Sequence, residues 1–498
     1  MENLKLQILT EEEIKKIHAC SLDILSTVGV SVGDSEARSI FKKAGCSVDE
    51  SSKVVRIPPS IVDECLHSVP KSFILHGRDS KFDVKMVGDG SVTNYINLGI
   101  GTRTAIYNGD GSYDIRDATL RDEANFAMVL ESCENINWFT QPASAMDLIN
   151  TKCARSLHEV DAMMSNCAKP FLPDPDVNYI DTYFEMIKTV YSGDEEEARK
   201  RPFFIIGGTT SSPLQLDAHM CQLYIRACRN SLPVMTMTME MAGTTSPIHL
   251  AGTLVLHNCE ALTNVVLAQL CRKGTPVIYG TATTAFDFVD STAPFGCPEA
   301  ALLSSALAQI AQFYGLPNIT TGGGSDSIHV DAQAGHESTL TAMLTQLAGS
   351  NNVFGSGLIE LGMTFSLEEL VLRDEMISME KRVKHGIRVD DETLSVDAIK
   401  AIGIAGDFIT RPETIANFDS MSKTLTFNRK MYDDWINSDP RDALDRAHAK
   451  VTDILFNYQP TPVDSDVRKQ LDQIIINADK AEGATESTQN LLDRVHHL

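Results

Sequence analysis

The chain has 498 residues, of which 43% are hydrophobic and 22% are charged, and this balance is typical of a soluble globular protein with one large domain or two to three smaller ones. Its formal net charge is -24 at pH 7. Phosphate contacts need a basic surface, so this charge argues against a nucleic-acid-binding protein. It favours an enzyme whose acidic clefts attract cationic ligands.

The eleven cysteines contain no CxxC motif and are odd in number, which indicates reduced thiols rather than a disulfide framework. The opening residues, MENLKLQILTEEE, lack the basic and apolar segments of a secretory signal peptide. No apolar run approaches the ~20 residues that a membrane-spanning helix needs. We therefore expect a soluble protein of the cytoplasm.

Residues 1–90 predict an N-terminal cap region of mixed helices and strands. Thr10 and Glu13 form the pattern of a capping box, so a helix should begin directly after Thr10. Residues 34–44 predict a second helix. Residues 46–90 alternate weakly and contain turns, which indicates short strands and loops.

Short apolar runs alternate with long amphipathic helices over much of the remaining chain. Gly208, Gly243, Gly280 and Gly323 end four of these runs and lie 35, 37 and 43 residues apart. A regular strand–helix period implies parallel strands, and eight such units close naturally into a (β/α)8 TIM barrel, which we assign to residues 91–424. An open doubly wound sheet is the alternative, although the chain has no GxGxxG after a strand and no GxxxxGK[ST]. The candidate strands lie within residues 91–107, 137–146, 169–174, 202–210, 233–243, 276–284, 317–325 and 352–360.

Two of the helices have predicted beginnings. GGTTSSP (207–213) and AGTTSP (242–247) each follow a candidate strand. Ser212 and Ser246 suit the N-cap position, and the prolines that follow them suit the first helical position.

The segment TTGGGSDSIHVDAQAGHE (320–337) places three glycines directly before a group of polar and ionisable side chains. Active sites of such barrels lie at the carboxyl ends of the strands. Gly322–Gly324 should therefore end a strand and permit backbone angles or close approaches that a Cβ would block. Asp326, His329 and Asp331 then lie in the loop at the barrel mouth. Two simpler explanations stay open: Asp331 caps the next helix, and His329 is a solvated loop residue.

The other strand ends offer carboxylates, amides and aromatics rather than nucleophiles or metal ligands. The chain has no GxSxG and no SxxK motif, and His257 and Cys259 are two apart on a predicted helix, so they point in different directions and we predict no metal site. Aromatic faces with nearby carboxylates hold quaternary ammonium groups, although plain core packing is the simpler role of each aromatic alone. Tyr279 is the exception, since its hydroxyl needs a polar partner. The strand-end residues are Glu240, Tyr279, Glu360, Gln141, Phe354, Phe286, Phe288 and Phe295.

Segments spread over the whole chain resemble the trimethylamine methyltransferase superfamily. Residues 320–337 resemble its signature region, and LTEEEIKKIHACSLDILSTVGVSV (9–32) resembles its N-terminal helix. Residues 204–213, 235–247 and ILFNYQPTPVDSDVRKQLDQII (454–475) are similar to its general pattern. Members are TIM-barrel enzymes that move an N-methyl group from a methylated amine to the cobalt of a separate corrinoid protein.

The resemblance implies a methyltransferase with no tightly bound cofactor of its own and a corrinoid-binding partner protein that carries a methylcobalamin-type group. The founding trimethylamine enzymes carry pyrrolysine, whereas this chain has only standard residues. We therefore expect a quaternary amine as methyl donor, as in the pyrrolysine-free relatives that act on glycine betaine, proline betaine, carnitine or γ-butyrobetaine. A trimethylamine-type enzyme, a direct tetrahydrofolate methyltransferase and a non-catalytic betaine-binding protein are the alternatives.

The resemblance and the strand-end positions together give the candidate residues their predicted roles. The predicted catalytic residues are Tyr279, Glu240 and Glu360, with the ring facing the methylammonium group and the carboxylates balancing its charge. The predicted substrate-binding residues are Tyr95, Gln141, Phe354, Asp326, His329, Asp331 and Gln333. The amides of Gly322, Gly323 and Gly324, with Arg103, are the predicted cofactor- or carboxylate-binding groups. Residues 425–498 should form a C-terminal helical extension that packs on the barrel or joins a homo-oligomer interface.

Overall fold

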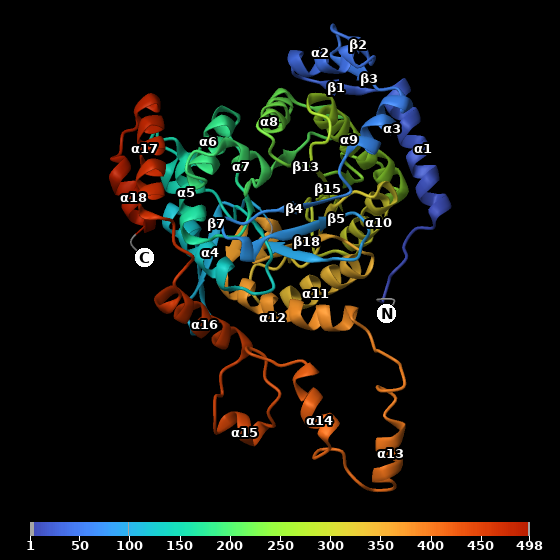
Figure 1. Ribbon diagram of the computed structural model, residues 1–498, viewed down its shortest axis with the longest axis vertical. Coiled ribbons are helices and arrows are strands. Elements are labelled where there is room, and N and C mark those ends of the chain that lie inside the picture. The colour runs from blue at the N-terminus through green and yellow to red at the C-terminus, as the bar shows by residue number, and fades with distance from the viewer. Residues whose placement is uncertain (1–3, 98, 497–498) are drawn as a thin grey trace.

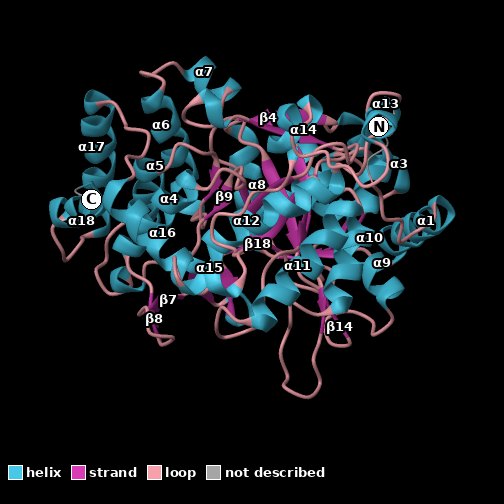
Figure 2. Ribbon diagram, turned by 90° about the horizontal axis from the view of Figure 1, so that it is seen from below, coloured by secondary structure: helices cyan, strands magenta, loops and turns pink. Residues whose placement is uncertain are grey.

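Parallel strands surrounded by helices form the body of the molecule, as Figures 1 and 2 show for the computed structural model, which describes residues 4–97 and 99–496. Six strands form one sheet in the order β11-β13-β15-β17-β18-β6, and every neighbouring pair is parallel. A second parallel pair, β9-β10, is joined to the two edges of this sheet by single bridges. The bounds are β6 Asn94–Asn97, β9 Phe139–Thr140, β10 Phe171–Leu172, β11 Ile206–Thr209, β13 Val234–Thr238, β15 Val277–Thr281, β17 Asn318–Thr321 and β18 Asn352–Ser356.

All eight segments predicted to hold a strand contain one, and the α/β class with a parallel sheet is confirmed. The strands do not form one continuous closed sheet, because single bridges (Tyr95 with Ile136, Phe171 with Phe204) make the two seams beside β9-β10. The prolines at positions 142, 170 and 173 flank these two-residue strands and have no N–H group with which to extend the ladder.

The inner side of the strands is a closed apolar core. It combines strand residues such as Ile278 and Ile319 with Leu75 and Met86 of the hairpin β4 (Ser72–Leu75) and β5 (Val84–Val87). The Asn94 side chain donates to Lys85 O, at the beginning of β6, so the hairpin lies at the amino end of the strands. Ligand sites of parallel α/β folds lie at the carboxyl ends of the strands, which the hairpin does not cover.

Helices cover the outer side of the strands, and the longest of them is α9. It has 22 residues and is apolar enough to cross a membrane by length and composition, but 78% of its most apolar window is buried, so it is a core helix. The capping box of Thr10 and Glu13 begins α1 as predicted. The bounds are α1 Glu11–Thr27, α4 Leu120–Ser132, α5 Arg155–Asn166, α6 Ile180–Val190, α7 Glu195–Lys200, α8 Ala218–Arg229, α9 Leu250–Cys271, α10 Pro298–Tyr314, α11 Ala332–Leu347 and α12 Leu367–Lys384.

The two predicted helix beginnings are wrong. The cap of α8 is Asp217, and α9 follows His249. Residues 211–216 instead form a tight turn whose last two residues, β12, pair with β1, and Ser246 closes a turn with Gly243. Ser212 and Ser246 have a local preference for helix caps, but contacts with other parts of the chain place them in turns instead.

The terminal regions add smaller elements. The N-terminal region contains α2, α3 and a sheet of β1, β3 and β2 that β12 extends, and β7, β8, β19 and β20 form a sheet beside the strand ends. The C-terminal helices α16, α17 and α18 pack on α4, α5, α6 and α12, while the segment with α13, α14 and α15 stands away from the body (Figure 1). The remaining bounds are α2 Ser35–Lys43, α3 Pro59–Ser68, α13 Val396–Ile402, α14 Pro412–Asn417, α15 Tyr432–Ile436, α16 Ala443–Asn457, α17 Ser465–Glu482, α18 Thr488–His496, β1 Val30–Val32, β2 Ser47–Asp49, β3 Val54–Arg56, β7 Arg103–Tyr107, β8 Tyr113–Asp117, β12 Gln215–Leu216, β14 Met241–Ala242, β16 Thr284–Ala285, β19 Leu358–Ile359 and β20 Thr364–Ser366.

Candidate functional site

The loops that follow β17 and β18 meet at the carboxyl end of the strands. The amide of Ser325 donates to Leu358 O at 3.2 Å, and the amide of Glu360 donates to Ser327 O at 2.7 Å. These bonds bring five of the residues considered in the sequence to one face. We call Arg103, Asp326, His329, Asp331 and Glu360 the mouth cluster.

Glu360 has the most unusual backbone of this cluster. Its φ is 53° and that of Leu361 is 56°, so two successive residues with side chains occupy the left-handed region. The carboxylate pairs with Arg103 at 2.9 Å, accepts a hydrogen bond from the Thr364 hydroxyl, and stays 25% exposed. Strained backbone that is held by specific contacts is concentrated at functional sites, so Glu360 is the leading candidate for a residue that faces a ligand.

Asp326 holds the loop after β15 over the mouth. Its carboxylate accepts the amides of Phe295 and Gly296 at 2.7 and 2.8 Å, and burial raises the pKa of Asp326. Asp331 caps α11 by accepting the amide of Ala334 at 2.9 Å, which confirms the simpler explanation of that residue. The two acids therefore shape the mouth.

His329 and Gln333 lie on the exposed side of the same loop. The His329 ring is exposed and stacks on Tyr113 of β8 with 5.1 Å between the centroids. Gln333 donates to Glu337 at 2.9 Å. Both side chains lie where an incoming molecule can contact them.

The three glycines serve close packing. A Cβ at Gly322 would lie 2.7 Å from Thr345 Oγ1, and one at Gly323, whose φ is 96°, would lie 3.0 Å from Arg373 Nη2. The amides of Gly322 and Gly323 donate to Phe354 O and Thr341 Oγ1. These two amides are therefore occupied within the fold rather than directed at a ligand.

Replacing Gly323 by alanine should lower the free energy of unfolding by about 1–3 kcal/mol, because a side chain strains the left-handed backbone and crowds Arg373. Urea denaturation measures this change. The matched control is Gly335→Ala in α11, where the added Cβ meets no atom within 4 Å and the helix should gain up to about 1 kcal/mol. Equal effects of the two substitutions would contradict the packing role.

A second polar group lies between β13, β15 and α9. The Glu240 carboxylate is 3.0 Å from His257 Nδ1 and accepts a hydrogen bond from Thr283 Oγ1 at 2.5 Å. Glu260 accepts the Ser212 hydroxyl and the Leu214 amide, both at 2.8 Å. Glu240 and His257 are fully buried, and Nε2 of the histidine has no hydrogen-bond partner among the described residues.

The two glutamates of this group differ in protonation state. Burial, followed by the negative charge of Glu240, raises the pKa of Glu260 to about 9. Burial also opposes ionisation of Glu240, but the charge and hydrogen bond of His257 and the hydroxyl of Thr283 outweigh it and lower the pKa of that carboxyl. At neutral pH, Glu260 is therefore protonated beside an ionised Glu240.

Replacing Glu260 by glutamine should stabilise the protein relative to wild type as the pH rises from 5 to 9. The folded state keeps the Glu260 proton up to a pKa of about 9, while the unfolded chain releases it near 4.5. Between these values the folded state binds more protons, so wild-type stability falls with pH by at most about 1.4 kcal/mol per unit. Glutamine retains a donor and an acceptor but does not titrate.

Urea unfolding at pH 5, 7 and 9 measures this difference. Glu36→Gln is the control, since Glu36 is a half-exposed partner of Arg229 with a lowered pKa, and its loss should add no slope between pH 6 and 9. Parallel stability curves for wild type and the Glu260 variant would show that Glu260 does not hold its proton.

Two aromatic side chains that were predicted to contact the substrate point away from the mouth. Tyr279 faces the helices: its hydroxyl is 2.9 Å from Asn258 Oδ1 of α9, and its ring contacts His257. Tyr95 faces α12, where Lys381 Nζ lies 5.4 Å from its ring centre. Side chains alternate along a strand, so the inner positions belong to their neighbours Ile278 and Ile96.

Phe354 and Gln141 are buried. Phe354 belongs to the inner core near the carboxyl end of β18. Gln141 donates to Ala143 O and accepts the Asp174 amide, so it links the segments that follow β9 and β10. The sequence reasoning missed His257 and Glu260 as partners of Glu240, although their spacing of three residues places them on one side of a helix.

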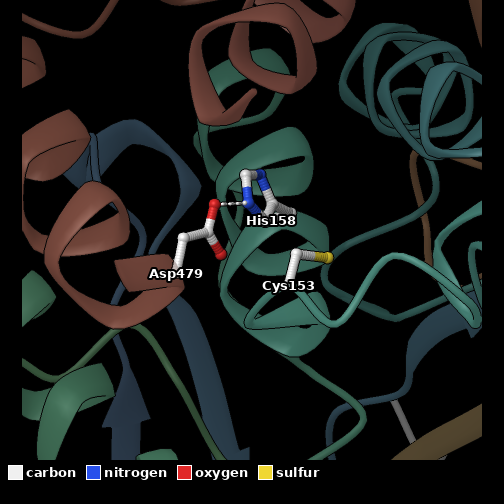
Figure 3. Close-up of side chains that lie close together, drawn as sticks. All are labelled: Cys153, His158 and Asp479. Atoms are coloured by element: carbon white, nitrogen blue, oxygen red, sulfur yellow. Dashed lines mark hydrogen bonds and ion pairs between the residues drawn. The ribbon is translucent and has the colours of Figure 1, made fainter. Parts of the chain in front are cut away.

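Cys153, His158 and Asp479 lie close together between α5 and α17, with potential ligand atoms within 4.8 Å of one another (Figure 3). The Asp479 carboxylate already accepts hydrogen bonds from the Ala154 amide and the Thr488 hydroxyl and is 2.9 Å from His158 Nε2. This group is explained as the link that ties the C-terminal helices to α5. All eleven cysteines are free.

Comparison with known proteins extends over nearly the whole chain. The trimethylamine methyltransferase (MTTB) family model matches residues 2–483. Trimethylamine methyltransferase MttB of Methanosarcina thermophila is 42% identical over 472 residues, which cover 95% of this chain and 97% of that protein. MttB of Desulfitobacterium hafniense is 35% identical over 98% of this chain and 97% of that protein.

Two further similarities are more distant. Glycine betaine methyltransferase of Desulfitobacterium hafniense is 32% identical over 96% of this chain and 98% of that protein. The solved structure of the Methanosarcina barkeri monomethylamine methyltransferase (MtmB) is 11% identical, with a TM-score of 0.49 over 94% of this chain and 93% of that one. On the family match and the sequence identities, this chain belongs to the trimethylamine methyltransferase (MTTB) family.

Proposed function

We propose that this protein transfers a methyl group from a small methylated amine to the cobalt of a corrinoid protein. The observation that carries the proposal is 42% identity, over 95% of the chain, to a protein named trimethylamine methyltransferase. The relatives also favour trimethylamine as the donor, since the glycine betaine enzyme is less similar, at 32%. This preference differs from the quaternary amine expected from the sequence.

A betaine-type quaternary amine is the second candidate. The observation in its favour is that the chain has only standard residues and so lacks the pyrrolysine of the founding trimethylamine enzymes. A quaternary ammonium donor needs no proton, because a neutral tertiary amine leaves with the electrons of the broken N–CH3 bond. Trimethylamine must be protonated before dimethylamine can leave in the same way.

The mouth cluster supports a cationic donor. Glu360 and Asp326 place carboxylates at the carboxyl end of the strands, and both candidate donors carry a positive charge when they react. The chain would bind the cation, orient its methyl group outward and exclude water. The acceptor is the corrinoid of the partner protein, which supplies the nucleophile for the methyl group.

Exposed apolar side chains in the loops after the strand ends support the docking of such a partner. They come from the loops that follow β13, β15, β17 and β18. Unpaired apolar surface around a site marks a place where another molecule binds. The exposed residues are Ile248, Phe288, Val289, Ile328 and Met363.

We further propose that the eight strands act as a closed (β/α)8 barrel of residues 91–424, between the cap region 1–90 and the C-terminal extension 425–498. The bridges beside β9-β10 support this closure. We also propose that the protein is soluble and cytoplasmic, and the burial of 78% of the most apolar window of α9 supports solubility.

Methylation of free cob(I)alamin, and of a purified corrinoid protein, tests the function. The absorbance of Co(I) is followed with trimethylamine and with glycine betaine, proline betaine, carnitine and γ-butyrobetaine, and a reaction without amine is the control. Turnover with trimethylamine supports the first donor, and turnover with a betaine alone supports the second. No turnover with any amine and either acceptor would contradict the proposal.

A further inference from the structure

A recess beside the loop that follows β17 combines carboxylates with apolar walls. It has a volume of about 310 Å³ and lies between the first halves of α11 and α12 and the beginning of α16. Within the described part of the chain its lining holds three acids, Asp331, Glu369 and Asp442, and no lysine, arginine or histidine. The larger apolar side chains that line it are Val330, Leu372, Met376, Phe427 and Leu444.

Glu369 is the buried acid of this recess. The residue is 3% exposed, and its Oε2 accepts the amide of Gly357. The described residues give its other oxygen, Oε1, no hydrogen-bond donor, although Glu369 lines the recess. Buried polar atoms are nearly always hydrogen-bonded, so an unpartnered carboxylate oxygen at a cavity indicates that a ligand in the cavity serves as its partner.

The pKa of Glu369 indicates which charge this ligand should have. Burial raises that pKa to about 8, although the charge of Arg373 and the amide of Gly357 act to lower it. A cation beside the carboxylate would favour its ionised form, whereas an anion would disfavour it further. A positively charged ligand therefore suits this buried acid.

Asp331 and Asp442 stand at the exposed rim of the recess. Each caps a helix through Oδ1, which accepts the amide of Ala334 in α11 and the amide of Asp445 in α16, both at 2.9 Å. The amino end of a helix carries about half a positive unit charge, which offsets part of the charge of such acids. Three carboxylates exceed the charge of three helix ends, so the recess stays negative when Glu369 is ionised.

The walls of the recess select among cations. A metal ion such as Ca²⁺ takes six to eight oxygen ligands, and the aliphatic side chains of Val330, Leu372 and Leu444 offer none. The ring of Phe427 and the polarisable thioether of Met376 instead suit methyl groups around a positive nitrogen. The combination of acids and soft apolar walls favours an alkylated ammonium ion.

We propose that this recess binds a small methylated ammonium cation, with the positive nitrogen near Glu369 and the methyl groups against Phe427. The choice of methyl among alkyl groups rests on the proposed function, since methylated amines are its donors and its products. The site is distinct from Glu360, where the donor is placed above. Asp331 belongs both to the recess and to the mouth cluster, so an occupied recess would also hold the loop after β17.

Titration of the full-length protein with tetramethylammonium chloride at pH 8.5 tests the proposal. Calorimetry measures the affinity, and hydrogen exchange of residues 425–444, which contribute Phe427 and the α16 side of the recess, shows where the cation binds. We expect the cation to protect these residues in wild type. Glu369→Gln should weaken the binding that gives this protection by about tenfold or more, because the amide keeps an acceptor for Gly357 but has no charge.

Two further variants separate the recess from its surroundings. Glu368→Gln is the matched control: Glu368 is 4% exposed on the same helix but pairs with His448 outside the recess, so protection should stay as in wild type. Gly335→Leu should abolish protection while Glu369 stays intact, because a Cβ at Gly335 meets no atom within 4 Å and the longer side chain can fill the recess. Leucine favours a helix more than glycine does, so this variant should fold.

Two comparison solutes define the ligand class. Equal protection by tert-butanol, a neutral molecule of similar shape, would show that the recess selects apolar shape and no charge. Equal protection by sodium chloride would show that it accepts any cation. Either result, no protection by tetramethylammonium, or protection that survives both Glu369→Gln and Gly335→Leu would overturn the proposal. The measurement needs no turnover, so a failure of methyl transfer would contradict the proposed function and leave this binding result unchanged.

Discussion

Replacing Arg373 by methionine should lower the free energy of unfolding by about 3–5 kcal/mol. Arg373 is completely buried on α12, and its guanidinium donates to both carboxylate oxygens of Glu380, at 2.8 and 3.3 Å. It also lies close to Glu369, a buried carboxyl whose pKa burial raises to about 8 although the charge of Arg373 acts to lower it. Methionine fills a similar volume but leaves Glu380 buried without its cation.

Denaturation in urea at pH 7 measures this loss. Arg382→Met on the exposed side of the same helix is the control and should change stability by less than about 0.5 kcal/mol. Adding Glu380→Gln to the Arg373 variant should recover part of the loss, since the unpaired charge disappears. A double variant no more stable than Arg373→Met alone would show that packing, rather than the ion pair, explains the effect.

Replacing Glu360 by glutamine should reduce methyl transfer at least tenfold and leave unfolding almost unchanged. The pair with Arg103 is partly exposed, so its own contribution to stability is about 0–1 kcal/mol. The carboxylate charge next to a cationic donor is worth more, because a donor bound against this partly exposed carboxylate displaces water from it. Loss of that charge should raise the KM for the amine more than for the corrinoid protein.

Initial rates over a range of amine concentrations, together with urea unfolding, separate these effects. Glu50→Gln is the matched control: Glu50 pairs with Arg38 at 2.8 Å in the N-terminal region, far along the chain from the mouth cluster, and its loss should leave transfer intact. Wild-type kinetics in the Glu360 variant would remove this residue from the site.

The repeating pattern of apolar runs allowed the parallel strands to be predicted, but it could not predict the direction in which an individual side chain points. The runs around Ile278 and Ile319 are apolar and recur with a regular period, so their strands and parallel order follow from the sequence. Side chains of β15 point alternately to the inside and the outside of the sheet, and the direction of Tyr279 depends on which set is inside. All five residues of β15 are buried, so the sequence has no polar position that identifies the outer set. An error of one residue in this assignment turns the Tyr279 hydroxyl from the inner side of the strands to the outer side, where α9 lies.

The candidate site was predictable where its residues are close in sequence. Asp326, His329 and Asp331 share one loop, and that loop lies at the mouth. Arg103 and Glu360 are 257 positions apart, and only the meeting of β7 with β20 brings them together. The left-handed backbone at Glu360 and Leu361 could not be predicted either, because neither residue is a glycine or an asparagine.

The hairpin β4-β5 has a consequence for biosynthesis. Leu75 and Met86 leave the ribosome long before Ile319 and Phe354, which belong to the same inner core. Strand β6 likewise waits for β18, its partner more than 250 positions later. Until synthesis is nearly complete, the later strands are not available to complete the core around this apolar hairpin. The hairpin then stays partly exposed on the nascent chain or is bound by a chaperone.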